Sequence, residues 1–409
     1  MTRPKKHGMW TASFVGISLT QLAVFVVFYA LLTALPLYVT RELGGSATEA
    51  GLVVTLMILT QLLSRFGAEP MLQRLGRKRG LVLAVLAFAL ITSGYLWADG
   101  LGLLYVIRLL HGIPFGIITT ATGAIAANVV PVERRGEGIG YFAMATNVAV
   151  VIGPFVGLIL LQHISFTMVF AILSVVAFAS VAVSLVVHVP GDQPREPAVL
   201  RGEEPASRPG PRRGWSINEV IETKAIPISA VTGVITLAYA GITAFVPVFA
   251  DGIDLSAAAA YFFVVYAAAM LITRPYFGKR YDTRGPTSVI VPGLVFFAAG
   301  FAALSLTSSA LILLGAAALV GLGFGTLQPS LQTMAVQTTS YGRAGHATAT
   351  FFTFFDTGIG IGSIVLGLVV DAFGFRTLYA GSAVLMAVTI PLYLAVASSH
   401  QTPEAPTAG

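Results

Sequence analysis

The chain has 409 residues, of which 56% are hydrophobic and only 10% are charged, whereas about a quarter of the residues in soluble domains are charged. With a mean hydropathy of +0.84 and many apolar runs of about twenty residues, the sequence predicts a protein that crosses a membrane repeatedly. The absence of cysteine excludes disulfides, thiolate metal sites and cysteine nucleophiles.

The first apolar stretch begins at Trp10 and continues to Val39. It is too long for the core of a signal peptide, and no small-residue cleavage pattern follows it, so we expect it to remain as the first span. Hydropathy predicts twelve spans and therefore an all-α polytopic membrane protein. The expected spans are 10–39, 48–72, 80–98, 101–129, 139–163, 165–188, 226–250, 255–278, 287–307, 309–335, 348–370 and 377–397.

The segments between these spans alternate in charge. Most of the 24 lysine and arginine residues lie at the start of the chain, in the long middle segment, and in the loops QRLGRKRG, ERRGE, GKRYDTRG and SYGRAGH. Because positively charged loops stay inside the cell, both termini are expected in the cytoplasm, with the protein in a bacterial-type cell membrane. The loops expected on the cytoplasmic side account for the net charge of +6, so nucleic acid is not an expected partner.

A segment of different composition separates the first six spans from the last six. Residues 189–225 are rich in proline, glycine and charge, and they end in WSINEVIETKA. This pattern predicts a flexible cytoplasmic linker that ends in a short amphipathic helix at the membrane surface. The expected domains are therefore a six-helix bundle at 1–188, this linker at 189–225, and a second six-helix bundle with a short cytoplasmic tail at 226–409.

The two halves resemble each other with an offset of 209 residues, and with a slip of one residue YALLTALP at 29–36 resembles YAGITAFVP at 239–247. A parallel repeat of six spans is a known transporter architecture, in which the substrate site lies between the halves near the middle of the membrane. The offset aligns Ser64 with Thr273, Arg65 with Arg274, Gly112 with Gly321, Gly116 with Gly325, Arg134 with Arg343, Gly136 with Gly345, and Gly153 with Gly362.

The loop after the second span, EPMLQRLGRKRG, is similar to the GxLaDRxGRR pattern of the major facilitator superfamily. Gly76, Arg77 and Lys78 fit the pattern, whereas Glu69 replaces its first glycine and Gln73 its aspartate. The resemblance to this superfamily extends over the whole chain outside the linker. It implies twelve transmembrane helices in two pseudo-symmetric six-helix bundles, the MFS fold, and a monomeric protein.

The corresponding loop of the second half, GKRYDTRG, keeps more of the pattern, at Gly278, Asp282 and Gly285. In the fourth span, RLLHG resembles the RxxQG motif of the family, with Arg108 kept and His111 in place of the glutamine. The basic loops are expected to form gate contacts, although they also follow from topology alone.

The fifth span contains a pattern similar to that of the drug:proton antiporter branch with twelve spans. Gly140, Gly153 and Pro154 fit it, whereas Ala149 and Leu158 stand where the pattern prefers glycine. A Gly-Pro pair inside a span frees a backbone carbonyl and lets neighbouring helices approach closely. The pair is therefore expected either to serve antiport or simply to bend the helix.

Asp356, in FFTFFDTGIG, is the only carboxylate deep inside an expected span, and the offset pairs it with Asn147. Ionisable groups inside the membrane are functional candidates, and low dielectric favours the neutral form that a proton carrier needs. Arg108 and His111 lie one turn apart on one helix face, and the resemblance implies that Arg108 faces the central cavity. We expect these three residues to couple proton movement to transport; structural hydrogen bonds and packing are the alternatives.

Two further groups complete the predicted site. Arg65 with Glu69, and Arg274 with Asp282, lie on single helix faces near the cytoplasmic ends, where they form ion-pair gates or extend to the membrane surface. The expected gate and motif residues are Arg65, Glu69, Gly76, Arg77, Lys78, Asp282, Gly285, Gly153 and Pro154. The expected substrate-binding residues are Asn147, Gln21, Tyr29, Tyr239, Gln328 and Phe355.

The predicted function is secondary active transport, as a proton-coupled efflux system for small amphipathic or cationic compounds that contributes to multidrug resistance. The alternatives are export of an endogenous metabolite such as a metallophore, proton-coupled import of a sugar or an anion, and lipid translocation. The chain has no Walker loop, HExxH or GxSxG motif, so an enzyme is not expected. The expected energy source is the proton gradient, without a cofactor or metal, and the expected partners are the lipid bilayer, a small-molecule substrate and protons.

Overall fold

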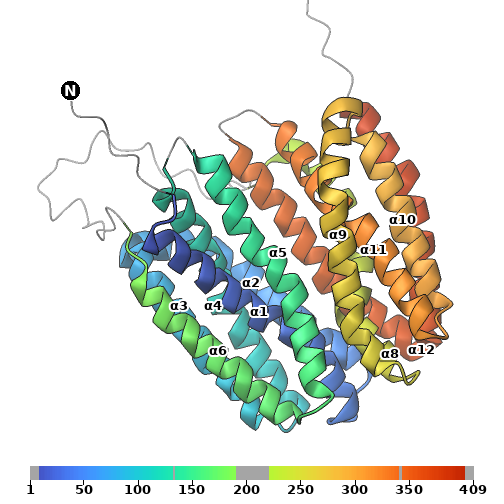
Figure 1. The fold of residues 1–409 in the computed structure, drawn as a ribbon, viewed down its shortest axis with the longest axis horizontal. Helices are drawn as coiled ribbons and strands as arrows, with labels where there is room; N and C mark the ends of the chain where they lie inside the picture. Colours follow the sequence, from blue (N-terminus) through green and yellow to red (C-terminus); the bar gives the residue numbers. More distant parts are fainter. Residues whose placement is uncertain (1–8, 132–133, 190–220, 340–342, 401–409) are drawn as a thin grey trace, which may run out of the picture. The chain divides into compact units, whose positions relative to one another are not determined.

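The computed structural model describes residues 9–131, 134–189, 221–339 and 343–400 (Figure 1). Within these ranges the chain is helical and has no strand, and eleven of its helices are long and apolar enough to cross a membrane. The expected fold class, an all-α polytopic membrane protein, is therefore confirmed. The last two expected spans share one element of 57 residues, which is broken at Gly374 (φ 80°, ψ 168°).

The helices follow the expected spans closely. The hydroxyls of Thr11, Ser165 and Ser309 fix three helix starts, because each accepts a backbone N–H from three residues further on. The helices are α1 (Ala12–Arg41), α2 (Ala47–Leu75), α3 (Arg77–Gly94), α4 (Leu101–Val129), α5 (Arg135–Leu161), α6 (Phe166–Val186), α7 (Ile226–Ala240), α8 (Val246–Asp251), α9 (Ser256–Arg284), α10 (Thr287–Ser305), α11 (Ala310–Gln337) and α12 (Ala344–His400).

Most of the expected amphipathic helix WSINEVIETKA lies outside the described residues, as do parts of the loops ERRGE and SYGRAGH. The described end of the linker is a 3-10 turn, Thr223–Ala225, that leads into α7.

The chain forms two compact units: unit 1 contains residues 1–44 and 56–212, and unit 2 contains 45–55 and 213–409. In unit 1, α1 packs against α4, α5 and α6, and α3 lies beside α4 and α6 (Figure 1). In unit 2, α7 packs against α12, and α11 packs against α9 and α10. The division expected from the sequence, at 1–188, 189–225 and 226–409, stays a prediction.

The 209-residue repeat recurs in the packing inside each unit. In unit 1, a Cβ added to Gly112 of α4 would lie 2.2 Å from the Met57 carbonyl oxygen of α2. In unit 2, a Cβ added to Gly321 of α11 would lie 2.2 Å from the Tyr266 carbonyl oxygen of α9. Met57 and Tyr266 are themselves 209 positions apart, so equivalent glycines permit equivalent helix contacts.

Two glycines of the motif loops also have the same backbone conformation. Gly76 starts α3 at φ 84°, and Gly285 follows α9 at φ 78°, and the two are 209 positions apart. Residues with a Cβ rarely adopt this region, so glycine permits the sharp turn between two spans in each unit.

A face of small residues brings α12 into backbone contact with α7 in unit 2. A Cβ added to Gly358 would lie 2.4 Å from the Gly233 carbonyl oxygen, and one added to Gly362 would lie 2.4 Å from the Leu237 carbonyl oxygen. Any larger side chain would force the two helices apart. These glycines therefore form a packing face, and the face fixes the position of the α12 backbone around Asp356 relative to α7.

The first turn of α2 belongs to unit 2, where it contacts α12. The carboxylate of Asp371 accepts the N–H groups of Ala47 at 2.8 Å and Thr48 at 2.9 Å. Two turns further along α2, the Thr55 hydroxyl donates to the Gly360 carbonyl oxygen at 2.6 Å. The N–H groups in the first turn of a helix have no partner inside the helix, so a carboxylate placed there stabilises it.

Candidate functional site

Asp356 lies beside an aromatic wall in unit 2. Its neighbour on α12, Phe355, has its ring centroid 6.2 Å from that of Phe324 on α11. The ring of Phe324 is in turn stacked on that of Tyr239 from α7, at 3.9 Å and an interplanar angle of 6°. Tyr239 and Phe324 are buried, whereas Phe355 and Asp356 are partly accessible. Asp356 is thus next along α12 to a wall of rings contributed by three helices, and its side chain is partly accessible.

Two other groups adjoin this wall. The Tyr239 hydroxyl lies 3.4 Å from the Tyr266 hydroxyl of α9, so a hydrogen bond fixes one edge of the stacked ring. Gln328, which was expected to contact substrate, is partly accessible and lies one turn after Phe324 on α11. Unit 2 therefore joins two of the expected residues, Phe355 and Tyr239, through Phe324, with Asp356 next to Phe355 on α12 and Gln328 one turn after Phe324 on α11.

Gln21, the expected substrate ligand in α1, is buried among polar side chains of unit 1. Its carbonyl oxygen accepts the Thr122 hydroxyl of α4 at 2.7 Å, and its amide nitrogen donates to the Thr146 hydroxyl of α5 at 3.1 Å. Both ends of the amide thus hold helices together. Asn147, the next residue after Thr146, is partly accessible.

Tyr29 belongs to an aromatic cluster of unit 1 that resembles the wall of unit 2. The ring of Phe28 is stacked on that of Phe115 at 4.4 Å, and Tyr29 is 5.0 Å from Phe28. Phe115 and Phe324 were not among the predicted site residues, although they are 209 positions apart. The sequence offset, applied to aromatic residues, would have identified this pair.

Arg108 and His111 lie together in the interior of unit 1, and both are completely buried. The His111 ring is placed between two hydroxyls, with Nδ1 3.0 Å from the Tyr95 oxygen and Nε2 3.1 Å from the Thr92 oxygen. The Arg108 guanidinium donates to the same Tyr95 oxygen at 3.4 Å. Two residues that were not predicted, Thr92 and Tyr95, therefore complete the group.

The donors available fix the direction of these hydrogen bonds. Arg108 can only donate, so the Tyr95 oxygen accepts from it and the Tyr95 hydrogen points to His111 Nδ1. Thr92 has one hydrogen, which it gives to the Phe88 carbonyl oxygen at 2.7 Å, and so it accepts from His111 Nε2. When His111 is neutral, each of the three hydrogen bonds that link Arg108 to Tyr95, Tyr95 to His111 and His111 to Thr92 then has one donor and one acceptor.

The motif loop of unit 1 contains a carboxylate at an unexpected position. Glu69 accepts the Gln73 amide at 3.1 Å and pairs with Arg77 at 3.3 Å, across the turn at Gly76. Glu69 thus lies one turn before Gln73, the position where the family pattern has aspartate, and contacts it. Lys78 is partly exposed beside this pair. The expected contact of Arg65 with Glu69 stays a prediction.

The remaining expected gate residues are placed as follows. Asp282 is exposed near the end of α9, and Arg274 is half-buried two turns earlier. In unit 1, Gly153 and Pro154 are buried inside α5, which continues as a helix through the proline. A Cβ added to Gly153 would lie 2.7 Å from the Tyr29 Cβ, so this glycine permits close packing of α5 on α1.

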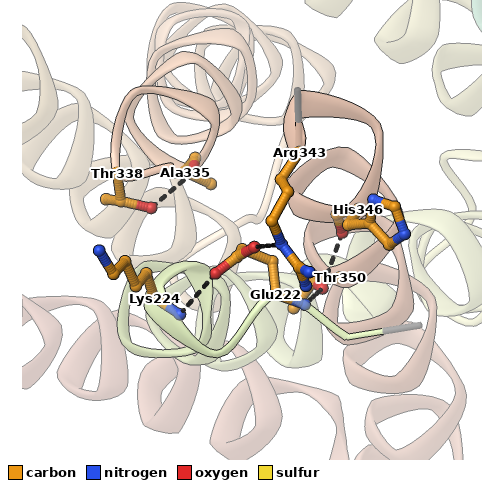
Figure 2. A network of polar contacts seen from close by, with 7 residues as sticks. All are labelled: Glu222, Lys224, Ala335, Thr338, Arg343, His346 and Thr350. Atoms are coloured by element: carbon orange, nitrogen blue, oxygen red, sulfur yellow. Dashed lines mark hydrogen bonds and ion pairs between the residues drawn. The ribbon is translucent and has the colours of Figure 1, made fainter. Parts of the chain in front are cut away.

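A polar network that the sequence did not predict lies at the start of α7 (Figure 2). The carboxylate of Glu222, which is 5% exposed, forms an ion pair with Arg343. The Glu222 N–H donates to the Thr350 hydroxyl at 2.9 Å, and the Lys224 N–H donates to the Glu222 carboxylate at 3.4 Å. The hydrogen bond from Arg343 lowers the pKa of the Glu222 carboxyl from its ordinary value. The network ties the start of α7 to the start of α12.

The repeat is broken at this network. Arg134, which the offset aligns with Arg343, pairs with Glu137 only three residues further on, at 2.7 Å. An arginine at equivalent positions thus stabilises a helix start locally in unit 1 and holds two helices together in unit 2.

A family model described as Major Facilitator Superfamily matches residues 17–363 and 263–408. An uncharacterized MFS-type transporter of Methanocaldococcus jannaschii is 22% identical over 349 residues, which are 84% of this chain and 88% of that protein. One from Burkholderia mallei is 27% identical over 376 residues, which are 88% of this chain and 86% of that protein.

Solved structures resemble the fold over nearly its whole length. A POT family transporter in complex with 5-aminolevulinic acid gives a TM-score of 0.78 at 11% identity, covering 95% of this chain and 96% of that one. A variant of the nucleoside transporter NupG gives 0.73 at 14% identity, covering 94% and 99%. At these identities the likeness concerns the fold alone, whereas the family model covers most of the sequence. The chain belongs to the major facilitator superfamily and is a secondary transporter.

Proposed function

We propose that this transporter exchanges protons for a small amphipathic or cationic compound, which it exports by alternating access. The observation that carries the proposal is Asp356, a partly accessible carboxylate that directly follows Phe355 of the aromatic wall on α12. A carboxylate in apolar surroundings is stabilised by a proton or by a cation, and aromatic ring faces attract cations. Proton and cationic compound therefore compete for one place.

Competition of this kind is sufficient for exchange. A ligand shifts a conformational equilibrium only through its different affinities for the two states. If proton and compound bind Asp356 in alternation, each displaces the other, and the proton gradient drives the compound outward. The close packing of Gly153 on α1, at a motif that resembles the antiporter branch, supports exchange in preference to import.

The geometry gives less support to import of an anion. That function would require Arg108 to contact the substrate directly, but its guanidinium is completely buried and donates to Tyr95 inside unit 1. An arginine at the accessible edge of the aromatic wall would have favoured the anion. Export of an endogenous metabolite fits the same residues as drug export, and only substrate tests separate the two.

The test is transport of ethidium into proteoliposomes under an imposed pH gradient. Asp356→Asn keeps the size of the side chain and removes its titration, so we expect gradient-driven uptake to be abolished while the folded yield stays normal. The matched control is Asp99→Asn, an exposed carboxylate between α3 and α4, which should transport as the parent does. Undiminished uptake by Asp356→Asn would refute the coupling role.

A second experiment addresses the substrate class. A drug-hypersensitive strain that expresses the chain should tolerate more of several cationic dyes or antibiotics, and Asp356→Asn should remove that tolerance. Unchanged tolerance to the whole panel, together with coupled proton movement in vesicles, would replace multidrug export with export of a dedicated metabolite.

A further inference from the structure

The seventh span contains one residue more than the span it repeats. Between tyrosine and proline, YALLTALP of the first half has one residue fewer than YAGITAFVP of the second half, so Tyr29 and Tyr239 are 210 positions apart whereas Pro36 and Pro247 are 211 apart. The packing of equivalent glycines shows that the rest of each bundle keeps the repeat closely. The extra residue must therefore be accommodated inside the span.

The structure shows how it is accommodated. In unit 1, α1 remains an α-helix from Ala12 to Arg41, through Pro36. In unit 2, α7 ends at Ala240, a π-helical segment occupies Gly241–Phe245, and α8 begins at Val246. A single inserted residue widens one helical turn in this way, and such segments are often found at functional sites. The slip in the sequence repeat and the π-helical segment are the same feature.

Proline maintains the segment. Pro247 has no N–H group, and its ring excludes the ordinary hydrogen bond to the carbonyl four residues earlier, on Thr243. Phe245, at φ −113° and ψ −17°, departs from regular helix geometry just before it. Part of the backbone hydrogen bonding of an α-helix is thus missing in the middle of span 7.

One side chain from the second half of α12 contacts the span on either side of this loss. The completely buried Tyr379 donates its hydroxyl to the Gly241 carbonyl oxygen at 3.3 Å. Its ring also packs on Phe249 of α8, with the centroids 5.2 Å apart. Tyr379 therefore contacts span 7 on both sides of the π-helical segment, by a hydrogen bond at its start and by ring packing beyond its end.

The other side of the segment is attached to the aromatic wall. Tyr239, two residues before Gly241, is stacked on Phe324 and lies within reach of the Tyr266 hydroxyl. A change of bend at Gly241–Phe245 would consequently move α8 while the ring of Tyr239 stays against the wall. All of these contacts lie inside unit 2.

We infer that the extra residue of span 7 forms a bending joint at Gly241–Phe245 that operates during transport, and that Tyr379 is the positioning residue that sets its resting bend. The inference depends on the protein being a secondary transporter; its efflux test, unlike its hydrogen-exchange test, also takes ethidium as a cargo, as in the proposed function. It assigns a role to an asymmetry between two otherwise equivalent spans.

Amide hydrogen exchange on the purified full-length protein tests the joint without a substrate. Tyr379→Phe keeps the ring and removes the hydrogen bond, so exchange of residues 241–247 should accelerate about fivefold, as expected from losing one buried hydrogen bond. The matched control is Tyr393→Phe, elsewhere on α12. It removes a hydroxyl that lies 3.3 Å from the Thr287 hydroxyl of α10, and it should leave the exchange of residues 241–247 unchanged. Equal exchange in Tyr379→Phe and the parent would overturn the role of Tyr379.

Removing the joint should stop the cycle. Deletion of Thr243 restores the residue count of the first span. If the deletion variant does not fold, Pro247→Ala tests the same point without a change of length, because alanine allows a regular helix. Each should slow exchange of residues 241–247 and lower ethidium efflux from cells about tenfold, with less than about twofold change in its half-saturating concentration. Parental efflux from a folded variant with slowed exchange would refute the joint. Slowed exchange with lost efflux would support it, even if Asp356→Asn proved harmless.

Discussion

His111→Gln is the substitution that most sharply tests the buried chain of hydrogen bonds in unit 1. Neutral His111 accepts from Tyr95 at one ring nitrogen and donates to Thr92 from the other. A glutamine amide also has one accepting and one donating end, and glutamine occupies this place in the family motif that RLLHG resembles. Glutamine should therefore replace the histidine with the same bonding pattern, whereas His111→Leu offers neither end.

The size of the effect follows from the groups left without partners. In His111→Leu, the Tyr95 hydrogen loses its acceptor in a completely buried site, whereas the Thr92 hydroxyl keeps its bond to the Phe88 carbonyl oxygen. A buried polar group left unsatisfied costs about 1–3 kcal/mol, so the free energy of unfolding should fall by roughly 1–3 kcal/mol. His111→Gln should change it by less than about 1 kcal/mol, because both bonds are replaced.

Thermal unfolding of the purified variants measures the difference, and ethidium transport on the same samples separates structure from proton movement. Glutamine does not titrate, so a stable His111→Gln protein that no longer couples transport to protons would establish histidine as a proton carrier. If His111→Gln unfolds as easily as His111→Leu, the assigned hydrogen-bond directions are wrong.

Three further predictions concern unit 2. In Gly358→Val, the new Cβ would lie 2.1 Å from the Thr236 hydroxyl oxygen, so overpacking should lower the free energy of unfolding by about 1–3 kcal/mol. A variant that melts at the same temperature as the parent would contradict the close packing of α12 on α7. Asp371→Asn removes the charge at the first turn of α2 and should lower stability by about 0.5–2 kcal/mol, unlike the exposed Asp282→Asn, as thermal unfolding can measure. Because Arg343 lowers the pKa of the Glu222 carboxyl below its ordinary 4.5, the ion pair should stabilise the parent over Glu222→Gln at neutral pH, and this advantage should vanish as pH falls through the lowered pKa. A difference in melting temperature between these two proteins that stayed constant down to pH 3 would rule out that origin.

Hydropathy predicted the spans because every long helix must present apolar side chains to lipid or to other helices, whatever its neighbours are. The repeat predicted close packing as well, since Gly112 and Gly321 meet equivalent backbone atoms. The repeat also indicated the π-helical segment, because YAGITAFVP has one residue more between its tyrosine and its proline than YALLTALP. These features depend on local composition or on symmetry, which sequence displays directly.

It was harder to predict which side chains pair with one another, because this depends on how each helix is rotated about its axis and on the turns between helices. Spacing along one helix suggested Arg65 as a partner of Glu69, but it did not identify Arg77, which the turn at Gly76 brings to within 3.3 Å of that carboxylate. The group around His111 spans α3 and α4, and no periodicity within α4 identifies Tyr95 or Thr92. Glu222 was missed since it was assigned to an amphipathic helix, although it is the residue that holds Arg343.

The assignment of residues 45–55 to unit 2 bears on which parts of the chain can be produced separately. The second half of the chain, taken from residue 213 onward, does not contain the helix turn whose N–H groups Asp371 accepts, nor Thr55, which donates to Gly360. Part of unit 2 is therefore encoded in the first half of the chain. Cutting the linker leaves both pieces present, but a fragment made alone lacks a segment that its own sequence cannot supply.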